Sequence, residues 1–358
     1  RDLARRQISL GAGGRMRIEQ DTAVILSGVL AGVTTGAPIT LLVENRDHAK
    51  WLGKDVPAYT TPRPGHADLN GVLKYGYNDI RPVLERASAR ETVVRVAAGA
   101  VCRKFLESLG IHIGGYVSAI GAVCADLKDM PLEERLARAR ADETQCPDAH
   151  AAAAMRTAIA AIMQAKDTLG GIIEVVATGL PVGLGSHVHY DRRLDGRIAA
   201  ALLSVQAMKG VEIGDAFENA RLPGTQVHDA IYLQGSQLVR TTNRAGGLEG
   251  GMTNGQPLVV RAAMKPIATT LNPQPTVDLA SGLPTQTEYE RSDFCPVPRA
   301  VVILEAVLAL VLADAVMEKL GGDSLAEILP RMAQLKQANL ADARMEGGSN
   351  VWWAGAVT

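Results

Sequence analysis

The sequence has few cysteines, few aromatic residues and almost no net charge. Its four cysteines, Cys102, Cys124, Cys146 and Cys295, include no CxxC pair. Neither a disulfide framework nor a zinc knuckle is therefore expected, and a reducing, cytoplasmic location is the default. With three Phe, seven Tyr and three Trp, the core must be aliphatic. The 37 basic and 38 acidic residues give a formal net charge of −1, which disfavours binding to nucleic acid.

A membrane span and a signal peptide are also not expected. The longest apolar stretch, 300–316, carries Glu305 and Asp314, and charges are costly in hydrocarbon, so it predicts a buried helix. The 358 residues, 47% apolar and 21% charged, suit about two domains or one large sandwich. The chain starts at Arg1 without Met, in what reads as the end of a helix, so we expect residues upstream.

Short strands alternate with helices along the chain. Strands are predicted over 22–30, 39–44, 111–120, 171–177 and 257–264, and helices over 88–110, 149–166, 194–208, 299–320 and 324–343. The segments 127–148 and 210–255 read as irregular. Because the connections are not regular βαβ units, an α+β sandwich fits better than a doubly wound sheet. We expect one domain over 1–346 and a tail over 347–358.

A basic segment with one histidine follows the first strands. Six cationic side chains and His66 occur within roughly thirty residues: Arg63, Lys74, Arg81, Arg86, Arg90 and Arg95. Ser88 and Arg90 stand at a predicted helix start, which favours an anion. A solvated basic face is the alternative, but the proline and glycine turns favour a site for an anionic small molecule. His66 is a candidate proton donor or acceptor, with a structural role as the alternative.

A second candidate segment is rich in glycine. Residues 243–257 lead into a strand and then into Lys265–Thr270. They match neither a GxGxxG fingerprint nor a P-loop. The glycines allow close approach to a flat or phosphorylated ligand, and Lys265 with Thr269 and Thr270 would suit a phosphate. A flexible linker is the alternative.

The remaining motifs are weaker. Glycine-rich runs at 180–186 and 209–217 predict tight turns at strand edges. His187 and His189 have metal-like spacing, but no third ligand accompanies them, so no metal site is expected. The Arg291-Ser292-Asp293 turn precedes the long apolar helix and gains a function only if a partner faces it.

In this order, the segments resemble the chorismate synthase family. The resemblance rests on RPGHADLNGVLKYG, ERASARETVVRVAAGA, TLGGIIEVVATGLPVGLGS, KGVEIGDAF, NRAGGLEGGMTNGQPLVVRAAMKP and RSDFCPVPRAVVILEAVLALVLAD. It spans about Leu3 to Ala326. It implies an α+β sandwich with helices packed between antiparallel sheets, a homotetramer, and the anti-1,4-elimination of phosphate from 5-enolpyruvylshikimate 3-phosphate with reduced FMN to give chorismate. NADPH would act only through a separate flavin reductase.

The resemblance also implies roles for individual residues. His66 would stabilise the charge of the reduced flavin, and Asp293 would take part in proton removal. The FMN-binding residues would be Arg86, Ala87, Ser88, Gln206, Ala207, Gly250, Lys265, Pro266, Ile267, Ala268, Thr269 and Arg291. Arg6, Arg15 and Arg90 would hold the phosphate and carboxylates of the substrate.

Two departures from the family pattern keep an alternative open. The family's N-terminal histidine segment does not occur in this sequence, and Ala12 stands where the family often has an arginine. A non-catalytic protein that binds flavin or another anion is therefore the alternative. A dehydrogenase using NAD(P)H is a weaker one, because no Rossmann fingerprint supports it.

Overall fold

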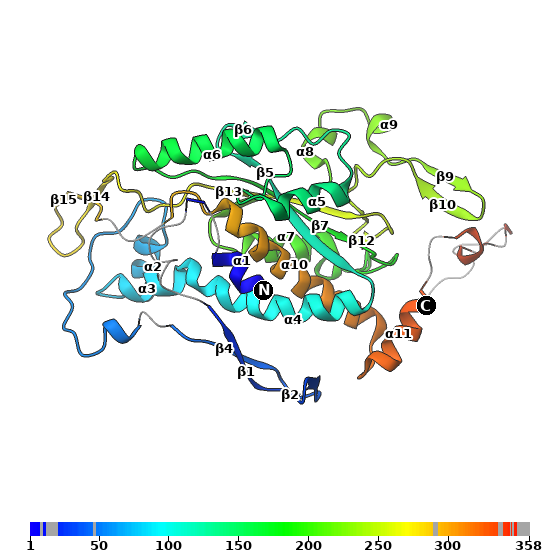
Figure 1. Ribbon diagram of the computed structural model, residues 1–358, viewed down its shortest axis with the longest axis horizontal. Coiled ribbons are helices and arrows are strands. Elements are labelled where there is room, and N and C mark those ends of the chain that lie inside the picture. Colours follow the sequence, from blue (N-terminus) through cyan, green and yellow to red (C-terminus); the bar gives the residue numbers. More distant parts are fainter. Residues whose placement is uncertain are drawn as a thin grey trace, which may run out of the picture.

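The computed structural model describes residues 1–7, 10–11, 21–45, 48–288, 293–335, 339–343, 345 and 347–348. A five-stranded antiparallel sheet lies on one side of a layer of helices, and the small sheet of β1 and β4 lies on the other side (Figure 1). This arrangement confirms the α+β sandwich.

The large sheet has the strand order β6-β5-β7-β13-β8. Its strands are β5 (His112–Ile120), β6 (Val123–Cys124), β7 (Gly171–Thr178), β8 (Met208–Ile213) and β13 (Leu258–Met264). Because side chains alternate along a strand, Ile173 and Val175 of β7 join the main core while Val176 belongs to a small cluster on the other face. Helix α5 (Leu132–Ala141) covers part of that second face.

The helical layer is built around α10 (Val297–Leu320), which packs against β5, β7, α1 (Asp2–Gln7), α4 (Thr92–Ser108) and α7 (Leu194–Leu203). Gly99 of α4 allows close contact there, since a Cβ at this position would lie 2.4 Å from the Cβ of Ala306. Among the described helices, only α10 is long and apolar enough to cross a membrane, and most of it is buried within the protein. It is therefore the central core helix, as predicted.

The other elements surround this sandwich. The strands are β1 (Ala23–Ser27), β2 (Val29–Leu30), β3 (Val33–Thr34), β4 (Thr40–Val43), β9 (Ile231–Gln234), β10 (Gln237–Arg240), β11 (Leu248–Glu249), β12 (Met252–Thr253), β14 (Pro275–Val277) and β15 (Pro284–Gln286). The helices are α2 (Asp68–Tyr75), α3 (Arg81–Ala87), α6 (Ala149–Gln164), α8 (Ala216–Asn219), α9 (Gly224–Val227) and α11 (Leu325–Ala333), with short 3-10 turns η2 (His48–Lys50), η3 (Ala89–Glu91), η4 (Tyr190–Arg192) and η5 (Leu340–Asp342).

Several local predictions were wrong. The segment predicted as irregular contains α5, whose Leu136 packs where Gly114 of β5 leaves space. Helix α7 ends at Leu203, and after a turn at 204–207 the residues Met208–Ile213 form β8 rather than further turns because they pair with β13. Helix α11 ends at Ala333 with Pro330 inside it. Most of the predicted tail lies outside the described residues.

The segment 210–255, also predicted to be irregular, contains regular structure. It holds the end of β8, the short helices α8 and α9, and two hairpins, β9–β10 and β11–β12. Ser88 was predicted to stand at the start of the long helix, but a short 3-10 turn lies between them. Ser88 caps η3 by accepting from the backbone N–H of Arg90, so α4 itself begins at Thr92.

Candidate active site

His66 lies in a tight loop whose side chains are bonded to one another. Asp68 Oδ1 lies 2.5 Å from His66 Nδ1, and Asp68 Oδ2 accepts from Arg63 Nε at 2.8 Å. Asp68 is fully buried and Arg63 nearly so, while His66 is partly exposed. Burial raises the pKa of Asp68, but the hydrogen bonds from His66 and Arg63 outweigh burial and hold this pKa well below its usual range. Asp68 is therefore a carboxylate at neutral pH.

The loop after β13 lies directly against the His66 loop. Arg63 Nη1 donates to Thr269 Oγ1 at 2.9 Å, and Lys265 Nζ donates to the carbonyl of Gly65 at 3.0 Å. Burial lowers the pKa of Lys265, and the nearby charge of Lys209 lowers it further. The predicted segment 265–269, which includes Pro266, Ile267 and Ala268, is thus adjacent to His66.

Gln206 and Ala207 come to the same place from the end of α7. The carbonyl of Ala207 accepts from the backbone N–H of Lys265 at 3.0 Å. Gln206 Nε2 donates to Glu91 Oε2 at 3.2 Å, which connects this segment to the residues that follow Arg86, Ala87 and Ser88. Among the described residues, the buried Oε1 of Gln206 has no hydrogen-bond partner.

The segment that contains Asp293 is linked to the same loop through two intervening residues. Its Oδ2 lies 2.5 Å from Arg299 Nη1, in the first turn of α10. The next residue, Phe294, accepts from the backbone N–H of Leu169 at 2.9 Å, and Thr168 Oγ1 donates to the carbonyl of Ile267 at 2.9 Å. Hydrogen bonds thus connect the segment that follows Asp293 to Ile267 of the 265–269 loop, through Leu169 and Thr168.

Arginines form a basic centre beside Asp293. Arg6 Nη1 and Arg90 Nη1 bind the two oxygens of Asp21, at 3.0 and 2.7 Å. The pKa of Arg6 is lowered to about 10; burial is the largest cause, and the positive charges of Arg299 and Arg90 add to it, against the opposing effect of Asp21. The guanidinium groups of Arg90 and Arg299 thus both lie within electrostatic reach of Arg6, and such a group of arginines suits a polyanionic ligand.

Not every predicted residue joins this cluster. Gly250 forms the turn between β11 and β12, next to Gly251, whose carbonyl accepts from the N–H of Leu194 at the start of α7. Gln206 follows the other end of that ten-residue helix, about 15 Å along its axis. Gly250 thus lies near the first residue of α7, while Gln206 follows its last turn. Arg15, Arg291 and Ala12 lie outside the described residues.

Sequence reasoning missed several residues of this centre. Arg299, Asp21 and Lys209 were not singled out, and Arg63 was noted only as one of several cations. The available signal for Arg299 was its position in the first turn of the long apolar helix, where a charge is buried only if it is paired or functional.

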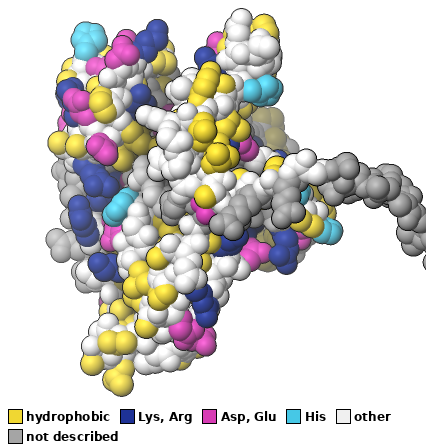
Figure 2. Space-filling model, turned by 90° about the vertical axis from the view of Figure 1, so that its right-hand side faces the viewer, with side chains coloured by type: hydrophobic (Ala, Val, Ile, Leu, Met, Phe, Trp, Pro, Cys, Tyr) yellow, Lys and Arg dark blue, Asp and Glu magenta, His cyan; other side chains and the backbone are white. Residues whose placement is uncertain are grey.

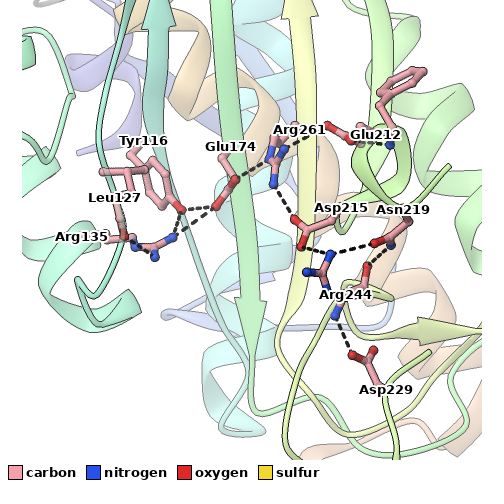
Figure 3. A network of polar contacts seen from close by, with 11 residues as sticks. Tyr116, Leu127, Arg135, Glu174, Glu212, Asp215, Asn219, Asp229, Arg244 and Arg261 are labelled. Atoms are coloured by element: carbon pink, nitrogen blue, oxygen red, sulfur yellow. Dashed lines mark hydrogen bonds and ion pairs between the residues drawn. The ribbon is translucent and has the colours of Figure 1, made fainter. Parts of the chain in front are cut away.

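A second polar network lies on the other face of the large sheet, where Figure 3 shows it from close by. The Tyr116 hydroxyl donates to Glu174, and Arg261 binds Glu174 at 2.9 Å, Glu212 at 3.1 Å and Asp215 at 2.8 Å. Burial and the charge of Glu174 raise the pKa of Tyr116 far above its usual range. These side chains join adjacent strands in register, so the network stabilises the sheet.

Comparison with known proteins identifies the family. The chorismate synthase family model matches residues 1–317. The chorismate synthase of Prosthecochloris aestuarii is 54% identical over 353 residues, covering 94% of this chain and 89% of the relative. That of Geobacter sulfurreducens is 50% identical over 344 residues, covering 91% and 88%.

A crystal structure of chorismate synthase is similar to this fold. It superposes with a TM-score of 0.74 at 43% sequence identity, over 93% of this chain and 86% of that one. Fold, sequence and the arrangement of the predicted segments thus agree. The chain belongs to the chorismate synthase family.

Proposed function

We propose that this lyase eliminates phosphate from 5-enolpyruvylshikimate 3-phosphate to give chorismate, with reduced FMN bound beside the 265–269 loop. One observation carries the proposal: chain segments far apart in sequence meet around that loop. The His66 loop contacts it through Arg63 and Gly65, Ala207 binds Lys265, and the Asp293 segment reaches it through Thr168.

The residues around the loop fit a flavin mononucleotide. The buried Oε1 of Gln206 is an unused acceptor among the described residues, and a flavin ring presents N–H groups that would satisfy it. Lys265 and Lys209 bring two positive charges together, and Lys265 Nζ donates to the carbonyl of Gly65, which carries no negative charge. A phosphate group would neutralise these charges.

The chain's own residues then have separate tasks. When bound, reduced FMN supplies the electron density that assists the departure of phosphate. His66 would stabilise the negative charge of the reduced flavin, and the Asp293 carboxylate would accept the proton that leaves as the new double bond forms. Arg6 and Arg90, with Arg299 close by, would hold the phosphate and carboxylates of the substrate.

The assembly and location are also proposals. A homotetramer is supported by exposed apolar side chains on protruding hairpins. Leu30 and Val33 are 74% and 68% exposed at the tip of the β1–β4 region, the lower projection in Figure 2, where hydrophobic groups gather. All four cysteines are free thiols, which suits a reducing cytoplasm. The reduced flavin would come from a separate reductase.

Anaerobic turnover tests the reaction. Protein mixed with dithionite-reduced FMN and 5-enolpyruvylshikimate 3-phosphate should release phosphate and build up chorismate absorbance. Asp293→Asn should abolish most turnover while still binding flavin and substrate, and His66→Ala should lower the rate far more than the affinity for FMN. If Asp293→Asn turned over substrate at the wild-type rate, Asp293 would have no part in the mechanism. Flavin binding without turnover by the wild-type chain would favour the non-catalytic alternative.

A further inference from the structure

We propose that Asp68 and Arg63 are positioning residues for His66: Asp68 fixes the imidazole with its proton on Nδ1, and Arg63 locks this pair to Thr269. The inference rests on the proposed function only for its kinetic consequence. Its structural content concerns four side chains of this chain and is testable without flavin or substrate.

Both oxygens of Asp68 are occupied. Oδ2 accepts from the backbone N–H and from Nε of Arg63, at 3.1 and 2.8 Å. Oδ1 lies 3.1 Å from Arg63 Nη2 and 2.5 Å from His66 Nδ1. A buried carboxylate with this many donors is rigidly held, and an ionised carboxylate can only accept hydrogen bonds.

This arrangement determines the tautomer of His66. Arg63 Nη2 also lies 3.0 Å from His66 Nδ1, but Nδ1 cannot accept from Arg63 while it donates to Asp68. The Asp68 contact is the shorter, and its acceptor is charged, so Nδ1 carries the proton. Arg63 Nη2 lies at a longer distance, 3.4 Å, from Nε2, so Nε2 is the nitrogen left to take a proton. Once protonated, the imidazole donates from both nitrogens, and Nε2–H is the group that would face the negative charge of the reduced flavin while Asp68 holds Nδ1–H.

Arg63 extends the arrangement to the neighbouring loop. Its Nη1 donates to Thr269 Oγ1 at 2.9 Å, while the same guanidinium binds Asp68 through Nε and Nη2. All three side chains other than His66 are almost completely buried. The orientation of the imidazole is therefore coupled to the position of the 265–269 loop, which lies beside His66 and holds Lys265.

Nitrogen NMR of the flavin-free protein tests the tautomer directly. Spectra recorded at alkaline pH, on protein labelled with ¹⁵N-histidine, distinguish Nδ1–H from Nε2–H imidazole, and loss of one signal set in His66→Gln identifies His66 among the seven histidines. Wild-type protein should show the Nδ1–H form. Asp68→Asn should move His66 toward the Nε2–H form that predominates in water. The Nε2–H form in wild-type protein, or an unchanged pattern in folded Asp68→Asn, would overturn the proposal.

A matched control separates this effect from the loss of any aspartate–arginine pair. Asp79, like Asp68, binds an arginine close in sequence: its Oδ2 accepts from Arg81 Nη1 at 3.0 Å. Asp79 does not contact His66. Asp79→Asn should leave the His66 signals unchanged. If Asp68→Asn does not fold, Asp68→Glu replaces it: the longer carboxylate should keep the Nδ1–H form with shifted signals, and a switch to Nε2–H there would count against the proposal equally.

Kinetics test the consequence for the proposed function. Asp68→Asn should lower kcat about 10- to 100-fold with little change in the KM for 5-enolpyruvylshikimate 3-phosphate, since the substrate does not need Asp68 to bind. Asp68→Glu should recover part of the loss. An altered tautomer with undiminished turnover would refute the role of His66 in the reaction and leave the positioning intact, so the two failures are distinguishable.

Discussion

Arg299 Nη1 lies 2.5 Å from Oδ2 of Asp293, and Arg299 is almost completely buried in the first turn of α10. The helix that forms the centre of the core thus holds the proposed proton acceptor. The same guanidinium contributes to the lowered pKa of Arg6, so one side chain connects Asp293 to the basic centre.

Arg299→Lys should lower kcat/KM about 100-fold, because a lysine keeps the charge but cannot reproduce the planar guanidinium contact, and small misplacements of a reacting group have effects of this size. Anaerobic phosphate release measures the change. Arg331→Lys is the control, since Arg331 Nη1 binds the carbonyl of Leu320 at the far end of α10. Equal losses in both variants would show a general effect on stability.

Lys265→Gln should weaken FMN binding about tenfold, which corresponds to about 1.4 kcal/mol. The reason is the loss of one of two neighbouring positive charges available to the flavin phosphate. Titration of FMN followed by fluorescence measures the affinity. Lys104→Gln removes an 85% exposed ammonium on α4 and should have no effect; unchanged affinity in Lys265→Gln would move the phosphate site elsewhere.

Asp68→Asn should lower the free energy of unfolding by about 2–4 kcal/mol at pH 7, because it leaves Arg63 buried without its carboxylate. The pKa of Asp68 is lower in the folded protein than in the unfolded chain, so its contribution is fully present above the ordinary aspartate pKa, about 3.9, and shrinks as the pH falls below that value. Urea unfolding of both proteins from pH 7 to pH 3.5 measures the difference. If the difference in unfolding free energy between wild-type protein and Asp68→Asn grew as the pH fell, the assignment of Asp68 as an ionised carboxylate would be wrong.

Gly99→Ala should destabilise the protein by about 1–3 kcal/mol, because the added methyl group would overlap the backbone and Cβ of Ala306. Gly196→Ala is the matched control on α7, where the nearest atom to an added Cβ is 4.0 Å away; it should be neutral or stabilising. Thermal unfolding compares the two. Equal midpoints would mean that α4 and α10 do not pack as closely as the structure shows.

The sequence predicted those elements whose pattern is local. The helix at Val297–Leu320 and the strands at His112–Ile120, Gly171–Thr178 and Leu258–Met264 agree with prediction to within a few residues, because continuous or alternating apolar runs report burial directly. Helix α5 was missed because its sequence is highly charged and few of its side chains are buried. Strand β8 was missed because its regular structure comes from pairing with β13.

The sequence by itself determined the family, the aliphatic core and the identity of most residues proposed for the site. Motifs such as RPGHAD and RSD can be recognised in the sequence without any knowledge of the structure. Only the tertiary structure decided that Arg63 connects Asp68 to Thr269, that Arg299 holds Asp293, and that Gly250 lies at the other end of α7 from Gln206. These contacts join residues up to 206 positions apart in the chain. Their geometry depends on how the sheet and α10 pack, which no local pattern specifies.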